Sequence, residues 1–118
     1  MESSGKIVNV SSIAGRHRSL VSGVHYVSSK AGIIGLTRQI AYEVGNRGIN
    51  VNCVCPSQTL TDMLKESMTE TELKEFASSV PLKRLATIDD QVYPIMFLCS
   101  DEASYMTGSI LDVNGGQL

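Results

Sequence analysis

A strand, a long helix and a second strand follow one another in the first half of this 118-residue chain, and this order limits the possible folds more than any other feature. Residues 6–11 (KIVNVS) are mostly apolar and β-branched, which predicts a strand buried on both faces of a parallel sheet. Residues 26–46 carry an apolar stripe at three- and four-residue spacing, which predicts a helix. Residues 49–55 (INVNCVC) predict a second strand, which ends at Pro56. Such a βαβ unit has a right-handed crossover almost without exception, so we expect an α/β fold.

The remainder of the chain extends this pattern to a third parallel strand. Residues 60–79 are polar and charged with intermittent Leu and Met, which predicts two short helices that form a lid over one edge of the sheet. Thr87 or Asp89 can cap a helix that runs to about Cys99 and contains Pro94. Residues 109–113 (SILDV) predict the last strand. The helix positions expected to face the core are Ile33, Leu36, Thr37, Ile40, Ala41 and Val44, and then Val92, Ile95, Met96 and Leu98.

Chemically active side chains gather where these strands end. Ser12 follows the first strand, Tyr26 and Lys30 open the long helix, and Pro56 closes the second strand. Ligands of open α/β sheets bind at this carboxyl edge. Tyr26 and Lys30 are four residues apart and therefore share a helix face. An ammonium beside a phenol favours the phenolate, so such a pair can transfer protons near neutral pH.

Composition and charge exclude several other classes of protein. Apolar residues make up 42% and charged residues 19% of the chain, as in ordinary globular domains. A net charge of −2 argues against nucleic-acid binding. The three scattered cysteines lack the spacing of a zinc site or of a disulfide framework, so we expect no metal and a reducing cytoplasmic environment. No run approaches the roughly 20 apolar residues of a membrane span.

Four ordered motifs resemble the short-chain dehydrogenase/reductase family over almost the whole chain. Residues 5–15 (GKIVNVSSIAG) are similar to the family's fifth strand with its catalytic serine, and residues 26–32 (YVSSKAG) to its Tyr-x-x-x-Lys helix. Residues 48–56 (GINVNCVCP), with a Thr-Asp-Met sequence shortly after, resemble the sixth strand and the loop beside the nicotinamide. Residues 107–116 (TGSILDVNGG) resemble the closing strand.

The resemblance implies roles for individual residues. Tyr26 is expected to act as the general acid when a carbonyl is reduced and as the base when an alcohol is oxidised, with Lys30 supporting it. Ser12 is expected to donate a hydrogen bond to the substrate oxygen. An NAD or NADP cofactor would contact Tyr26 and Lys30. It would also contact Pro56, Thr59 and Thr61 beyond the second strand.

The same comparison predicts an incomplete fold. No G-x-G-x-x-G phosphate turn occurs in these residues, and neither does the residue that selects between NAD and NADP. Where the family usually has Pro-Gly, this chain has Pro56-Ser57. We therefore expect residues 1–118 to be the carboxyl half of a single Rossmann-like domain, a partial doubly wound parallel sheet of three strands. By itself the chain is expected to be inactive, and residues 7–10 should form an open apolar strand edge that invites association.

Three functional interpretations remain at this point. The leading one is an NAD(P)-dependent oxidoreductase that transfers a hydride between nicotinamide and a small carbonyl or alcohol substrate, forming a dimer or tetramer at full length. The alternative is a truncated, non-catalytic protein that pairs with full-length relatives through the long helix, where Ala31, Gly32 and Gly35 form a patch of small residues. A third is a structural or regulatory module without hydride transfer.

Several further residues near the predicted site are expected to have no catalytic role. Ser11 is expected to be structural, and His25 is expected to be a loop histidine. Residues 16–18 (RHR) can bind an anionic substrate. The favoured interpretation is a solvated loop, because runs of charged residues usually lie in solvent.

Overall fold

Three parallel strands form one sheet in the order β1-β2-β3 in the computed structural model, which describes residues 4–118. The strands are β1 (Gly5–Val10), β2 (Ile49–Pro56) and β3 (Ile110–Val113). Gly5 pairs with Ile49 at the start of the β1–β2 ladder, and Cys53 pairs with Ile110 at the start of the β2–β3 ladder. All three strands therefore end at the same edge, as the sequence predicts.

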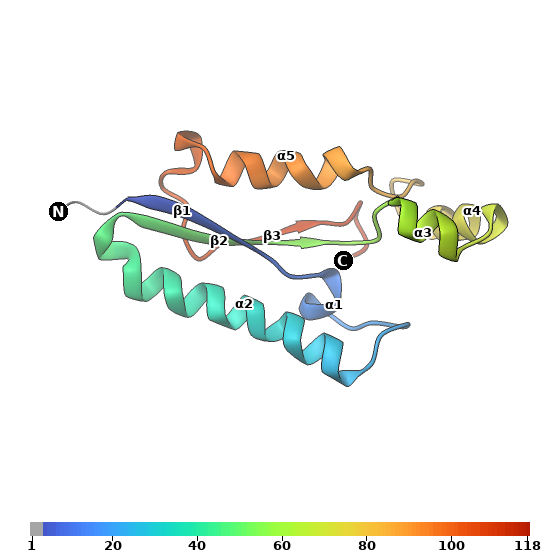
Figure 1. The fold of residues 1–118 in the computed structure, drawn as a ribbon, viewed down its shortest axis with the longest axis horizontal. Coiled ribbons are helices and arrows are strands. Elements are labelled where there is room, and N and C mark those ends of the chain that lie inside the picture. The colour runs from blue at the N-terminus through green and yellow to red at the C-terminus, as the bar shows by residue number, and fades with distance from the viewer. Residues whose placement is uncertain (1–3) are drawn as a thin grey trace.

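Helices cover both faces of this sheet (Figure 1). The long helix α2 (Val24–Val44), extended by a 3-10 turn η1 (Gly45–Arg47), lies on one face. Helix α5 (Ile88–Leu98), followed by the turn η2 (Asp101–Ala103), lies on the other. The short helix α1 (Ile13–Arg16) sits at the end of β1, while α3 (Asp62–Ser67) and α4 (Glu70–Ser79) project beyond the carboxyl ends of the strands. This arrangement confirms the predicted α/β fold and its pair of short helices.

The core lies around β2, the central strand. Val51, Cys53, Val54 and Cys55 have no exposed surface at all. Cys53 and Cys55 point to one face, where they contact Ile34 of α2. On the other face Val54 packs with Leu98 of α5 and with Ala103. The alternation of β2 side chains between two helical layers is what fixes its position between them.

Strand β1 departs from the prediction that it is buried on both faces. Ile7 is 44% exposed and Val10 is 45% exposed, although their side chains leave the strand on opposite faces. Within residues 4–118 β1 has a strand neighbour on one side only, which leaves its outer half uncovered. The prediction of an open apolar edge describes this strand correctly.

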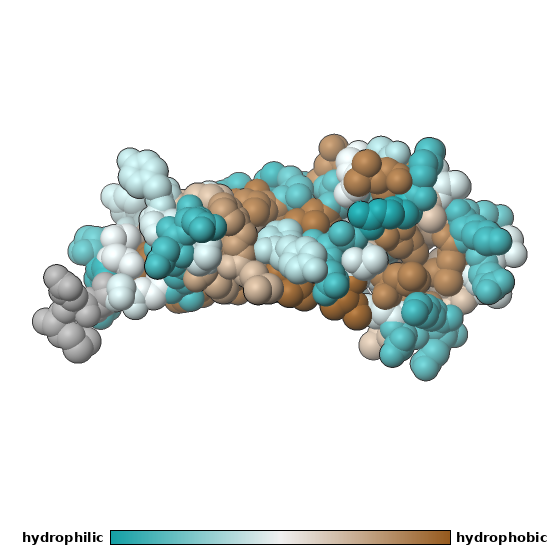
Figure 2. Space-filling view, turned by 90° about the horizontal axis from the view of Figure 1, so that it is seen from above, coloured by the Kyte–Doolittle hydropathy of each residue, from teal (hydrophilic) through white to brown (hydrophobic). Residues whose placement is uncertain are grey.

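The predicted core positions of the two main helices are correct only in part. In α2, Thr37 and Ala41 are buried as predicted, but Leu36 is 53% exposed and Ile34 is buried instead. In α5, Leu98 is buried, but Val92 and Met96 are exposed, because the helix contacts the sheet along the line of Leu98 and its half-buried neighbour Ile95. The exposed apolar side chains of α5 form part of the brown band seen from above in Figure 2.

Side chains cap the starts of α4 and α5, and the Thr87 cap of α5 is one of the two that the sequence offers. Thr69 and Glu72 form a reciprocal capping box at the start of α4, and Thr87 and Asp90 form another at the start of α5. Helix α2 begins two residues before Tyr26, after Gly23, which provides no side-chain cap. None of the helices within residues 4–118 is long and apolar enough to cross a membrane.

Candidate active site

Ser12 and Tyr26 meet at the carboxyl end of the sheet because two loops bring them there. Ser12 leaves β1 and occupies the N-cap of α1, and Tyr26 is in the first turn of α2. Both side chains line the same two neighbouring cavities. This brings together the hydroxyl and the phenol that the sequence singles out.

The Ser12 hydroxyl is oriented by its own helix. Its Oγ accepts a hydrogen bond of 3.1 Å from the backbone N–H of Ala14. A hydroxyl that accepts in this way still has its own proton to donate. Ser12 is therefore suited to donating a hydrogen bond to an oxygen in the cavity.

The neighbouring Ser11 locks the Ser12 loop onto α2. Ser11 is buried, and its Oγ donates a hydrogen bond of 2.6 Å to the backbone carbonyl of Lys30. Gly15 lies against the same carbonyl, and a Cβ at Gly15 would be 2.7 Å from the Lys30 carbonyl carbon. These two contacts set the distance between α1 and the helix turn that carries Tyr26 and Lys30.

Tyr26 and Lys30 share a helix face, as their spacing predicts. The Lys30 Nζ is 5.5 Å from the centroid of the Tyr26 ring, within the range of a cation–π contact. Lys30 is half-buried and does not line either of the two cavities that contain Tyr26. Its charge is therefore placed beside Tyr26 rather than in the cavities themselves.

The two cavities differ in size and lining. The smaller, of about 170 Å³, is lined by Ser11, Ser12, Ile13, Tyr26, Pro56, Ser57 and Gln58. The larger, of about 430 Å³, is lined by Ser12, Ile13, Ala14, His17, Arg18, Ser19, Leu20, Val21, Ser22, Tyr26, Gln58, Phe76, Gln117 and Leu118. The larger volume is in the range of small-molecule sites, and both cavities open beside the same hydroxyl and phenol.

Of the cofactor residues predicted at and after the end of β2, only Pro56 lines a cavity that contains Tyr26. Pro56 lines the smaller cavity. Thr59 donates its hydroxyl to the carbonyl of Ser57 over 3.1 Å, and Thr61 caps α3 by accepting from the N–H of Leu64 over 3.2 Å. Neither threonine lines the two cavities that contain Tyr26, so their hydroxyls act here in shaping the loop.

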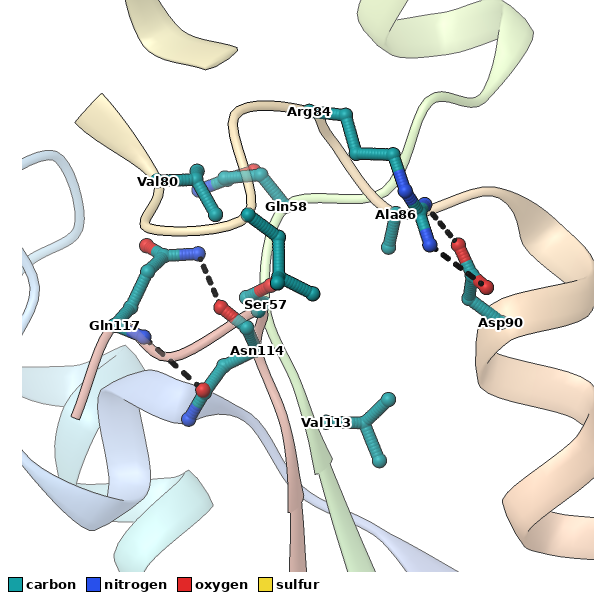
Figure 3. A pocket seen from close by; sticks show the side chains of 11 residues that line it. Ser57, Gln58, Val80, Arg84, Ala86, Asp90, Val113, Asn114 and Gln117 are labelled. Carbon is teal, nitrogen blue, oxygen red and sulfur yellow. Dashed lines mark hydrogen bonds and ion pairs between the residues drawn. The ribbon is translucent and has the colours of Figure 1, made fainter. Parts of the chain in front are cut away.

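A third cavity, of about 140 Å³, lies where β2 and β3 end (Figure 3). Gln117 holds its rim by two hydrogen bonds to Asn114, and the Arg84–Asp90 ion pair closes another side. It shares Gln58 with the two larger cavities but includes none of Ser12, Tyr26 and Lys30. The predicted catalytic residues therefore lie outside this cavity.

Charged contacts and burial shift several pKa values around the site. Arg16 of α1 makes a two-pronged ion pair with Asp112 of β3, at 3.0 and 2.9 Å, and the Asp112 carboxylate raises the pKa of Arg16. Burial, followed by the neighbouring Cys53 thiol, raises the pKa of Cys55 to about 11. Cys55 is therefore a packing residue and not a nucleophile.

Sequence reasoning missed several of the cavity residues, among them Gln58, Phe76, Gln117 and Leu118. Gln58 follows the end of β2 and lines all three cavities, so the rule that ligands bind where parallel strands end could have found it. Phe76, Gln117 and Leu118 reach the cavity from α4 and from the segment after β3. No local pattern in the sequence indicates those approaches. Residues 4–118 contain no cluster of three or more side chains able to hold a metal ion.

Comparisons with known proteins extend over nearly the whole chain. The family model for enoyl-(acyl carrier protein) reductase matches residues 1–117. Protein FixR of Bradyrhizobium diazoefficiens is 45% identical over 97% of this chain and 40% of its own length. The 3-oxoacyl-[acyl-carrier-protein] reductase FabG of Rickettsia conorii is 40% identical over 97% of this chain and 46% of its own length.

Solved structures show the same relationship. A 3-oxoacyl-[acyl-carrier protein] reductase from Brucella melitensis superposes with a TM-score of 0.88 at 35% identity, over 95% of this chain and 41% of that one. A second structure of such a reductase from Brucella melitensis, with bound NAD, gives 0.82 at 34% identity, over 95% of this chain and 40% of that one. The chain thus spans less than half the length of the relatives it matches.

Proposed function

The chain belongs to the short-chain dehydrogenase/reductase family, and on that premise we propose that it carries the proton-transfer residues of an NAD- or NADP-dependent carbonyl reductase. The observation that supports this most is the shared cavity lining of Ser12 and Tyr26, with Lys30 one turn beyond Tyr26. The FabG relatives act on 3-oxoacyl groups, so a 3-oxoacyl thioester is the substrate class to test first.

The three side chains divide the chemistry between them. A reduced nicotinamide, when bound, would supply the hydride that the carbonyl carbon accepts. Ser12 donates a hydrogen bond to the carbonyl oxygen as negative charge develops there. Tyr26 gives its hydroxyl proton to that oxygen, which completes the alcohol, and the Lys30 ammonium stabilises the phenolate left behind.

The nicotinamide end of the cofactor would lie near Pro56, beside the smaller cavity, with Thr59 and Thr61 shaping the loop that follows. The pyrophosphate end has no matching turn, because no G-x-G-x-x-G occurs in these 118 residues. We therefore propose that the 118-residue chain alone does not bind the dinucleotide. A titration with NADH and NADPH tests this, and micromolar affinity of either for the chain would contradict it.

The proposed reaction is tested with the native-length protein, that is, the protein as it is purified from its source cell. Consumption of NADH or NADPH is followed with 3-oxobutanoyl-CoA as substrate. Ser12→Ala is expected to lower kcat by about 100-fold, the usual effect of removing an oxyanion donor. Ser28→Ala, at an exposed position of α2, is the matched control and should leave kcat unchanged. Equal rates for wild type and Ser12→Ala would contradict the assignment.

A second candidate, a non-catalytic partner that pairs with longer relatives, also has a structural basis. Gly32 and Gly35 face open space, with nothing within 4 Å of a Cβ placed there, so the outer side of α2 is free to receive another helix. We propose that the same surface supports a homo-oligomer of the catalytic form.

We also propose a cytoplasmic location, because Cys53, Cys55 and Cys99 are all free thiols.

A further inference from the structure

The larger cavity beside Ser12 and Tyr26 has a wall of mixed character. Leu20, Phe76 and Leu118 give it an apolar lining from three separate segments of the chain. Arg18 and His17 line it as well, and no aspartate or glutamate does. The wall of this cavity therefore combines apolar side chains with one arginine and one histidine.

The structure separates the basic run at 16–18 into two parts. Arg16 is held by both oxygens of Asp112, so its charge is compensated and it points to β3. Arg18 is exposed and forms no ion pair with any residue between 4 and 118. The interpretation of the whole run as a solvated loop therefore does not fit Arg16, and Arg18 lies in the wall of the cavity that contains the hydroxyl and the phenol.

We propose that the carbonyl substrate of this site also carries an anionic group, and that Arg18, with His17 as a second donor, binds that group in the larger cavity. The guanidinium offers several N–H donors in a planar fork that matches a carboxylate or a phosphate. The hydrocarbon part of the substrate contacts Leu20 and Phe76. This inference rests on the proposed function, since it places the carbonyl at Ser12 and Tyr26.

Phe76 makes the inference more specific. It belongs to α4, which projects beyond the sheet (Figure 1), yet it lines the same cavity as Tyr26. The helix start is fixed by the Thr69–Glu72 capping box. An apolar side chain contributed by this helix favours a substrate that contains a hydrocarbon segment.

The test uses the native-length protein and two pairs of carbonyl compounds that differ in charge. One pair is 3-oxobutanoyl-CoA and the uncharged 3-oxobutanoyl-N-acetylcysteamine. The other pair is 5-oxohexanoate and its methyl ester, which separates a small carboxylate from a carrier phosphate as the source of the charge. Binding is measured by calorimetry and turnover by NADH or NADPH consumption, each at low and high salt.

The structure predicts that Arg18→Gln weakens binding of at least one anionic compound about tenfold and leaves its uncharged partner unaffected. The salt dependence of that binding should also be lost in the variant. Arg38→Gln, at an exposed position of α2 outside the cavity, is the matched control. Phe76→Ala should weaken the binding of the charged and the uncharged compound equally, in whichever pair the wild-type protein binds more tightly.

The outcomes distinguish a failure of the proposed anion site from a failure of the proposed carbonyl reduction. Charge-selective binding that depends on Arg18, without turnover of any compound, would support the anion site and contradict the proposed reaction. The opposite result is turnover that Arg18→Gln lowers equally for charged and uncharged compounds, or does not lower at all. This would contradict the anion site and still support the proposed reaction.

Discussion

At the scale of single residues, two adjacent serines have distinct tasks. Ser11 is buried and commits its hydroxyl to the Lys30 carbonyl, so it holds the loop. Ser12 accepts from Ala14 and keeps its proton for a partner in the cavity. We therefore propose Ser12, rather than Ser11, as the hydroxyl that binds the substrate oxygen.

The cysteines allow a prediction about reactivity. The raised pKa of Cys55, about 11, leaves almost no thiolate at pH 8, and both Cys55 and Cys53 are buried, whereas Cys99 is exposed. Iodoacetamide at pH 8 should therefore modify Cys99 at least tenfold faster than the other two in the folded protein. Mass spectrometry of digested samples measures the three rates, and denaturant should make them similar. Rapid modification of Cys55 in the folded state would contradict its burial.

At the scale of elements, the contact between α1 and α2 depends on Gly15. A Cβ there would meet backbone atoms of Lys30 at 2.7 and 2.8 Å, and backbone moves less easily than a side chain. Gly15→Ala should therefore destabilise the protein by roughly 1–3 kcal/mol, the usual range for overpacking, and lower activity by displacing Ser12 from Tyr26. Urea unfolding measures the stability.

Gly45→Ala is the matched control for that variant. Gly45 lies in right-handed helical conformation, and nothing is within 4 Å of a Cβ placed there. Replacing it should leave stability unchanged or raise it by about 0.4–1 kcal/mol. If both alanine variants behave alike, the close approach of α1 to the Lys30 carbonyl is not a determinant of the site.

The start of α5 gives a pH-dependent prediction. The Arg84 side chain, then the Thr87 backbone N–H, lower the pKa of Asp90 well below its usual range. A carboxylate with a depressed pKa stabilises the folded state above its unfolded pKa, near 4, and this contribution disappears as the pH falls further. Asp90→Asn should therefore lower Tm at pH 6, and this Tm difference should shrink steadily as the pH falls from about 4 toward the depressed pKa of Asp90. Calorimetry across this range tests it, and a Tm difference independent of pH would refute it.

The elements show how far sequence reasoning reaches. The strands and the capped helices α4 and α5 could be predicted, because β-branched runs and Thr-x-x-Glu or Thr-x-x-Asp boxes act locally. The burial of Ile34 in place of Leu36 could not, because Ile34 is selected by contact with Cys53 and Cys55 from a distant strand. Tertiary contact decides that choice.

The candidate site was likewise predictable only where its residues lie on local motifs. Ser12, Tyr26 and Lys30 lie on short motifs, and the topology brings their elements to one edge. Phe76 and Arg18 could be assigned to the cavity only when the loop and α4 had been placed in space. Pairing of Arg16 with Asp112, 96 residues apart, is equally invisible in the sequence.

At the scale of the whole molecule, the open strand β1 is the main liability. Ile7 and Val10 are nearly half exposed beside backbone groups that have no strand partner on the outer side within residues 4–118. Such edges pair readily with other chains. The purified 118-residue chain should therefore self-associate in sedimentation experiments, and Ile7→Lys should reduce that association. A clean monomer at tens of micromolar concentration would show that the edge is not adhesive.

The central claim is that Tyr26 donates the proton in carbonyl reduction, and one pair of variants tests it most directly. Tyr26→Phe removes only the phenolic hydroxyl, while Tyr42→Phe makes the same change at a residue of α2 that is 87% exposed and outside the cavities. In the native-length protein, Tyr26→Phe should lower kcat by roughly 100-fold or more, in the range of general acid catalysis, and Tyr42→Phe should not. Wild-type turnover by Tyr26→Phe would contradict the account.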